Sequence, residues 1–438
     1  MKRFLAISLV LALSLSLFAG CGGSAPQEET PVPTTEPKRD YSEFAGIVAD
    51  PKTWYDELMA MPIANENMTE EELRKLAADA FRINLTFTWT PTQDISYEFT
   101  LLERTTAMSM PKGLAYTGLF YNNNNARGNI WKVLQYYDPE TGAVDVEKLG
   151  SDHFMVLSSA CSYGFMQAWN RVSNSHGLAG MDSYNKGYAN IVTVGPYEYN
   201  YYEHSFAHGD GTARIIEKNG MQVMLESYAA MKQADGVYSS TSYHVMMCAE
   251  NPVVVRLPDG TIDANQSYVL IHEQDTGGAR TTDLDTKQEN GVILRPLGSA
   301  NKKYTFLKLL EKNYVPFTCK EFLGEEPVEA GKAWLGTTTA TLESGKDVTA
   351  AEIFSNQIWG NYNVCTAEVQ VKDPSGNVLL IHCPAPTTRP DTFSMAFGSE
   401  VSQLNLAPLA NGSNTIHIYA RLSNGELLEA FQTVLKVG

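Results

Sequence analysis

The stretch "SSACSYGFMQAWNRVSNS" (Ser158–Ser175) runs from small polar residues into an amphipathic pattern. Apolar side chains recur at helical spacing after Cys161, which predicts a helix that begins at or near this cysteine. The first turn of a helix carries backbone N–H groups without intrahelical partners, and with the helix dipole these favour an anion. A thiol at this position titrates low and becomes a nucleophile. We therefore interpret Cys161 as a candidate nucleophile, the alternative being a small buried residue at a strand-to-helix turn.

The amino-terminal segment predicts export. Residues 1–21 have a basic start, an apolar run and small residues before Cys21, which is typical of a secretory signal and too short for a stable membrane span. The ending "LFAGC" resembles a bacterial lipobox, in which the cysteine becomes the lipidated first residue of the mature protein. We expect Cys21 to anchor the protein on the extracytoplasmic face of the cell membrane. Residues 22–45, rich in Pro, Thr and Glu, are expected to form a disordered tether.

Net charge and motif content limit the classes of ligand and partner that we expect this protein to bind. The formal net charge of -17 has no basic block to offset it, so we expect no nucleic-acid partner. The sequence contains no P-loop or dinucleotide fingerprint, and we expect no cofactor. His204 and His208 have i, i+4 spacing but lack the glutamate of HExxH, so we expect no metal there.

Cysteine usage also argues against a metal or redox motif, because the spacing is wide and no CxxC pair occurs. An odd number remains after Cys21, which leaves at least one free thiol. Cys365 and Cys383 are close enough in sequence to pair, but the sequence leaves this open. The five residues are Cys161, Cys248, Cys319, Cys365 and Cys383.

Two regions follow the tether. Residues 46–324 contain helical patterns between Asp50 and Ala80, with Thr69 as a helix cap, and then three apolar runs at 243–248, 251–257 and 267–274 separated by turns. Consecutive strands with tight turns predict an antiparallel sheet, and the Cys161 helix packed on it gives an α+β domain. In residues 325–438 helix signals nearly vanish and turn signals such as "DPSGN" and "SNGE" recur, which predicts an all-β, Ig-like sandwich.

Five short segments, taken in order, resemble the NlpC/P60 superfamily of papain-like cysteine hydrolases. These segments are "YTG" at 116–118, "CS" at 161–162, "AD" at 234–235, "HVMM" at 244–247 and "SYVLIHEQ" at 267–274. The resemblance covers roughly 116–274. It departs from the family where glycines are replaced by Tyr163 and Tyr243, and where the long Cys161–His244 spacing implies an insertion, so the chain looks like a divergent member.

The resemblance implies a papain-like fold in which Cys161 is the nucleophile and His244 its imidazole partner. A third group must orient that imidazole. Strand alternation places His272 and Gln274 on one face of their strand, so we expect one of them to reach His244 and Glu273 to point away. Removing His272 or Gln274 is then expected to lower turnover, and removing Glu273 to change little. For the substrate-binding residues we expect Tyr116, Ser162 and Trp169.

The function that follows is hydrolysis of an amide bond, with a peptidoglycan stem peptide as the expected substrate, because a lipid-anchored enzyme outside the membrane meets the wall first. The competing interpretation is a non-catalytic surface lipoprotein that binds carbohydrate or protein through an aromatic cleft and the Ig-like module. A thiol with a low pKa would distinguish the two, because it reacts with iodoacetamide below neutral pH.

Overall fold

A computed structural model describes the chain over residues 50–101, 104–110, 112–113, 115–121, 130–150, 156–172, 191–199, 209–274, 298–325, 333, 335–337, 357–362, 364–382, 394–396 and 412–437. All of them belong to one compact unit, Tyr41–Gly438. The expected signal peptide, the anchor at Cys21, the tether at 22–45 and residues His204, His208 and Cys383 lie outside the described residues. Within the described ranges, no helix is long and apolar enough to cross a membrane.

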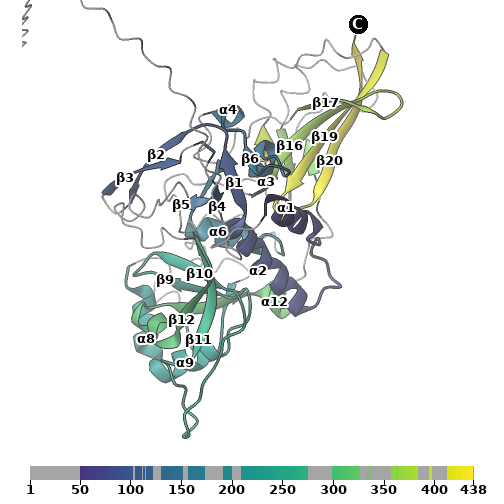
Figure 1. Cartoon of the computed structure of the whole chain (residues 1–438). Helices are drawn as coiled ribbons and strands as arrows, with labels where there is room; N and C mark the ends of the chain where they lie inside the picture. Colours follow the sequence, from purple (N-terminus) through teal and green to yellow (C-terminus); the bar gives the residue numbers. More distant parts are fainter. Residues whose placement is uncertain are drawn as a thin grey trace, which may run out of the picture. The chain divides into compact units, whose positions relative to one another are not determined.

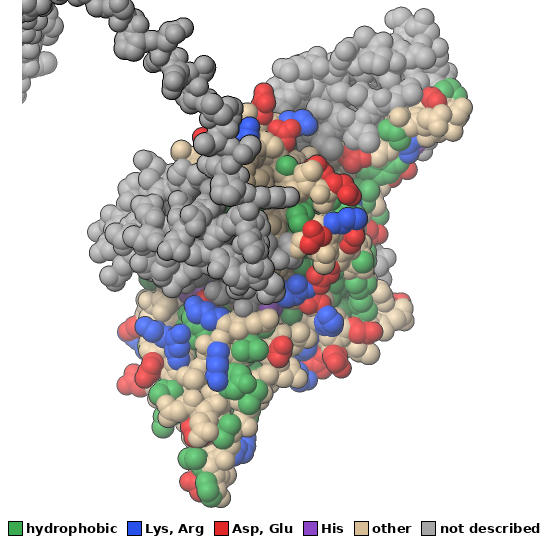
Figure 2. Space-filling view, in the orientation of Figure 1, with side chains coloured by type: hydrophobic (Ala, Val, Ile, Leu, Met, Phe, Trp, Pro, Cys, Tyr) green, Lys and Arg blue, Asp and Glu red, His purple; other side chains and the backbone are tan. Residues whose placement is uncertain are grey.

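The described chain mixes helices with several sheets (Figure 1). Acidic and basic side chains are interspersed over the described part of the face shown in Figure 2. The helices are α1 (Pro51–Ala60), α2 (Glu70–Thr86), α3 (Ile130–Val133), α4 (Val146–Leu149), α6 (Cys161–Trp169), α8 (Gly211–Asn219), α9 (Met221–Ala229), α11 (Phe306–Glu311) and α12 (Lys320–Leu323), with a 3-10 turn η2 (Leu134–Tyr136).

Helix α2 begins where the sequence predicts. The Thr69 hydroxyl accepts from the Glu72 N–H, and the Glu72 carboxylate accepts from the Thr69 N–H, which is a complete capping box. Its apolar face is buried, with Phe81 fully enclosed. Helix α6 packs closely on it, because a Cβ at Gly164 would lie 2.8 Å from the Phe81 ring. Glycine therefore sets how near these two helices approach.

The largest sheet has six antiparallel strands and carries His244 at the start of β10. Two core clusters of buried apolar residues form the interior, and the larger one packs the sheet against α2, α6 and α9. The strand order is β12 (Gly298–Thr305), β11 (Tyr268–Gln274), β10 (His244–Cys248), β9 (Gly236–Ser239), β13 (Val315–Cys319) and β8 (Ile191–Thr193).

The prediction of a strand at 251–257 is wrong. The run 251–257 forms only isolated bridges, Val253 with Tyr268 and Arg256 with Ile262. A side chain also holds this backbone, because the Ser267 hydroxyl accepts from the Val255 N–H and donates to the Val255 carbonyl. The other two runs form β10 and β11, paired antiparallel as predicted.

Five smaller groups of strands precede or follow this sheet in the described chain. Those before it are β4 (Tyr116–Thr117), β1 (Thr88–Pro91) and β6 (Ala143–Val144) in one sheet, the hairpin β2 (Ile95–Leu101) with β3 (Arg104–Met110), and the parallel pair β5 (Phe120–Tyr121) and β7 (Ser158–Ser159). The regular secondary structure in the described part of the carboxy-terminal region consists of strands, in two antiparallel sheets that contact each other. These are β14 (Leu335–Thr337), β15 (Gln357–Gly360) and β18 (Ser394–Ala396), and then β17 (Val378–His382), β16 (Val364–Lys372), β19 (Gly412–Leu422) and β20 (Leu427–Val437).

A buried ion pair joins α2 to the start of β9. Arg74 Nη1 lies 2.6 Å from Asp235 Oδ1, and the two side chains are 5% and 2% exposed. The Arg74 guanidinium also donates to the Gln233 carbonyl and lies over the Phe322 ring. Removing one partner of such a pair leaves an uncompensated buried charge, which is costly.

We expect Arg74→Met to lower the free energy of unfolding by about 3–5 kcal/mol, measured by urea denaturation. Arg214→Met is the control, because its ion pair with Asp210 is 59% and 64% exposed, and it is expected to cost less than about 1 kcal/mol. Adding Asp235→Asn to Arg74→Met should restore part of the loss. Equal effects of the two arginine changes would show that the buried pair does not secure α2.

Candidate active site

Cys161 is the first residue of α6, as the spacing predicts. Ala160, at the N-cap, has extended backbone and offers no side-chain oxygen to the first N–H groups of the helix. The thiol is 7% exposed, and Sγ lies 3.8 Å from the carbonyl oxygen of Tyr243. Because His244 is the next residue, this contact brings the start of the helix to the start of β10.

Opposing effects act on the pKa of the Cys161 thiol. Burial raises it, whereas a hydrogen bond with His244, the charge of His244 and the backbone N–H groups of Val245 and Ser162 lower it. The second group prevails, and the pKa of Cys161 lies below its usual range. The site therefore favours a thiolate beside an imidazolium.

The other side of the His244 ring faces a carboxylate. His244 Nε2 lies 3.3 Å from Glu273 Oε2, and the His244 side chain is 14% exposed. The same ring forms a hydrogen bond with the Cys161 thiol, so the imidazole links the thiol to the carboxylate. A carboxylate in this position fixes the orientation of the ring and stabilises its protonated form.

Glu273 is completely buried and still carries its charge. Burial raises the pKa of this carboxyl group, but hydrogen bonding to His244 and the charges of His244 and Lys302 lower it below its usual range. Lys302 Nζ contacts Oε1, and the Tyr304 hydroxyl donates to Oε2 at 3.3 Å. Each oxygen thus has a defined partner, and a cation compensates the buried anion.

The prediction that His272 or Gln274 contacts His244 and that Glu273 points away has to be corrected. In the β10–β11 pair Met247 lies opposite His272. Side chains alternate along a strand, so His244 and Glu273 both lie on the opposite face from this pair. Residues 271–274 are all buried, and burial therefore gives no indication of which face holds the site.

His272 and Gln274 make structural contacts instead. The His272 ring lies edge-on to Phe81 of α2, and its Nδ1 accepts from the Asn301 N–H at 3.4 Å. Burial and the nearby Arg82 lower the pKa of His272 to about 3, so the ring is neutral. The Gln274 amide donates to the Leu119 carbonyl at 2.6 Å, which ties the end of β11 to the amino-terminal region.

Two of the three expected substrate-binding residues lie in the core. Tyr116 is 2% exposed and packs against Trp89. Trp169 is fully buried, and its indole N–H donates to the Ala234 carbonyl. Both aromatic side chains contribute to core packing and do not line a cleft. Ser162 is half-buried beside Cys161, where its backbone N–H contacts the thiol.

Tyr243 is a residue that the sequence reasoning missed as a feature of the site. Its side chain is 59% exposed next to His244, and its φ of 48° is in the left-handed region that disfavours a side chain. Its place immediately before the candidate histidine was the available signal. Such strained positions cluster at functional sites.

The other described thiols lack these features. Cys248, Cys319 and Cys365 are buried, and burial raises the pKa of Cys248 and Cys319 well above the usual range. The pairing of Cys365 with Cys383, which the sequence leaves open, involves a residue outside the described ranges. Among the described residues, no group of three His, Cys, Asp or Glu side chains is placed to hold a metal ion.

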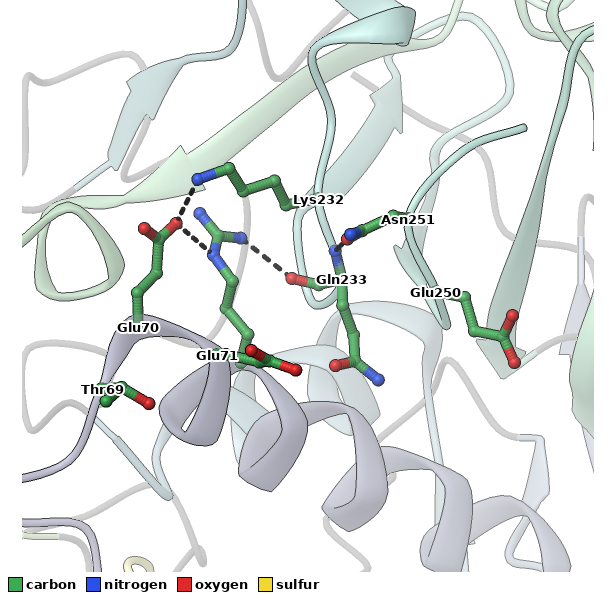
Figure 3. Close-up of a pocket in the computed structure, with 8 residues that line it drawn as sticks. Thr69, Glu70, Glu71, Lys232, Gln233, Glu250 and Asn251 are labelled. Carbon is green, nitrogen blue, oxygen red and sulfur yellow. Dashed lines mark hydrogen bonds and ion pairs between the residues drawn. The ribbon is translucent and has the colours of Figure 1, made fainter. Parts of the chain in front are cut away.

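A separate polar pocket of about 750 Å³ lies at the other end of β10, near Glu250 and Asn251 (Figure 3). Several of the groups drawn there are paired with one another: Glu70 contacts Lys232 and Arg74, and the Gln233 N–H donates to Asn251. Among the described residues that line it, none is aromatic. It therefore differs from the aromatic cleft of the competing interpretation.

Comparisons with known proteins do not identify the chain. No family model matches the sequence, and no curated protein matches it. The crystal structure of CopC from Methylosinus trichosporium OB3b is similar at 13% identity, over 24% of this chain and 94% of that chain, with a TM-score of 0.16. At that TM-score the likeness supports no argument about this chain.

We expect iodoacetamide to label Cys161 with a midpoint pH below the ordinary thiol value of about 8.5, measured by mass spectrometry of labelled peptides. His244→Ala should move the midpoint to higher pH, because burial then acts without the compensating imidazole. Cys248, buried and with a raised pKa, is the internal control and should stay unlabelled in the folded protein. A midpoint unchanged by His244→Ala would contradict the thiol–imidazole interaction.

Proposed function

We propose that this protein is a cysteine hydrolase of the NlpC/P60 type that cleaves an amide bond in peptidoglycan stem peptides. The observation that carries the proposal is the chain of contacts from Cys161 through His244 to Glu273. These are the three components that nucleophilic thiol catalysis requires: a thiolate, an acid–base partner and a group that orients it.

In the acylation step, the Cys161 thiolate attacks the carbonyl carbon of the scissile amide. The negative charge moves to the carbonyl oxygen, which is stabilised by backbone N–H groups at the start of α6. Collapse of this tetrahedral species breaks the C–N bond, and protonated His244 donates its proton to the leaving amine. The products are a thioester on Cys161 and a free amine.

In the deacylation step, neutral His244 accepts a proton from water, and the resulting hydroxide attacks the thioester carbon. The C–S bond breaks, the carboxylic acid leaves, and the thiolate–imidazolium pair is restored. Glu273 does not accept the proton: it holds the ring and stabilises its charged form through Nε2. Glu273 is thus a positioning residue, and Tyr243 supplies an exposed aromatic surface beside the reacting atoms.

The rest of the proposal depends on sequence features. The lipobox-like ending at Cys21 supports a lipid anchor on the outer face of the cell membrane, where wall peptides are within reach. The two carboxy-terminal antiparallel sheets support an Ig-like sandwich that serves as an accessory module. The order of "CS", "HV" and the following strand supports the family assignment.

We expect the purified protein to release new amino groups from peptidoglycan stem peptides, and Cys161→Ala to lower kcat by roughly 10³-fold or more. If wild-type protein binds these fragments without cleaving them, and Cys161→Ala binds equally well, the chain is a non-catalytic binding lipoprotein. Binding of intact fragments by both proteins, measured by calorimetry, separates these outcomes.

We further expect Glu273→Gln to lower turnover by roughly 10- to 100-fold and to move the alkaline limb of the pH–rate profile to lower pH. The shift follows because a neutral amide no longer stabilises the protonated imidazole. His272→Gln is the matched control on the same strand, and both its rate and its pH profile should stay near those of the wild type. Loss of activity in His272→Gln alone would return the orienting role to His272.

A further inference from the structure

A second buried site lies just beyond the carboxyl end of α6, and it is independent of the proposed hydrolase activity. Arg171 is 3% exposed, and its Nε and Nη1 atoms have no hydrogen-bond partner. Its remaining nitrogen, Nη2, donates to the Pro62 carbonyl at 3.3 Å, and the guanidinium lies over the Trp131 ring. A buried guanidinium with two orphaned nitrogens is expensive unless something else occupies the site.

A small cavity adjoins the Arg171 side chain. It is lined by the polar side chains of Arg171, Asn84, Gln167 and Ser423 together with apolar side chains, and its volume is about 20 Å³. Asn84 Oδ1 and Ser423 Oγ, both buried, are also without partners. This space suits one small group and is too small for phosphate or sulfate.

The charge around the cavity is positive. Arg421 lies over the same Trp131 ring, and its Nη1 donates to the Gly425 carbonyl. Burial, and then the charge of Arg421, lower the pKa of Arg171 to about 10, so it remains protonated at neutral pH. In the described chain neither guanidinium forms an ion pair with a carboxylate. Of the two guanidinium groups, the charge of Glu368 raises the pKa of Arg421 alone. The Cys365 thiol raises the pKa of both arginines.

We propose that this cavity binds one monoatomic anion, chloride, held by Arg171 and the Ser423 hydroxyl. A water molecule would satisfy the hydrogen bonds but leave the buried positive charge uncompensated. Turning the Asn84 amide by half a rotation presents its N–H₂ to the anion in place of the oxygen. The bound chloride joins the end of α6 to the turn between β19 and β20.

The test uses the full chain and compares chloride with gluconate, which is too large for the cavity, at constant ionic strength. Chloride at ten times its Kd should lower the unfolding equilibrium constant about 11-fold, seen as a higher thermal midpoint. Arg171→Met should remove this dependence, whereas Arg214→Met, an exposed arginine, should retain it.

Because Arg171→Met also removes a buried group and its packing, a crystal of the wild-type protein grown in bromide gives a second measurement that does not depend on the folding of the variant. An anomalous peak within about 3.5 Å of an Arg171 nitrogen supports the proposal. Equal midpoints in chloride and gluconate with no bromide peak would overturn it, in favour of water or a Cys365 thiolate as the internal counter-charge. A chloride effect that persists in Arg171→Met would overturn it too, because the ion would then bind elsewhere.

Discussion

The ionised carboxylate of Glu273 is the constraint around which the candidate site is arranged. A fully buried carboxylate is unstable unless cations and donors surround it, and here His244 and Lys302 contact its two oxygens from different strands. The same charge holds the imidazole in place and favours its protonated form. The low thiol pKa of Cys161 depends in turn on that imidazole. Sheet assembly and nucleophile activation are therefore linked through one side chain.

Helix α6 connects this chemistry to the core. Its first residue is the candidate nucleophile, and its last, Trp169, is buried against Phe165 and Phe317. The aromatic anchor fixes the helix axis, so the thiol is positioned by packing and not by a flexible loop. Gly164 permits the close contact with α2 that completes this support.

Sequence periodicity was sufficient for local structure and for part of the site. The Thr69 cap, the start of α6 at Cys161 and the strands β10 and β11 follow from spacing and residue type, which act over a few neighbours. The orienting residue could not be predicted in this way. Alternation along β11 was correctly described, but both of its faces are buried, and the lysine that compensates Glu273 comes from β12, a strand that the sequence reasoning did not identify. The substrate-binding roles predicted for Tyr116 and Trp169 were wrong for a related reason, because an aromatic residue near a motif can pack in the core as readily as it can line a cleft.

The burial of both faces of β11 has a consequence for folding. A slip of one residue against β10 would exchange the faces of His272 and Glu273, placing an ionised carboxylate against the Phe81 ring and a neutral imidazole beside Lys302. Such a chain would be destabilised by an unpaired buried charge and would lack the contact that orients His244. The electrostatics of the interior therefore select one strand register. That register is also the one that gives a reactive thiol.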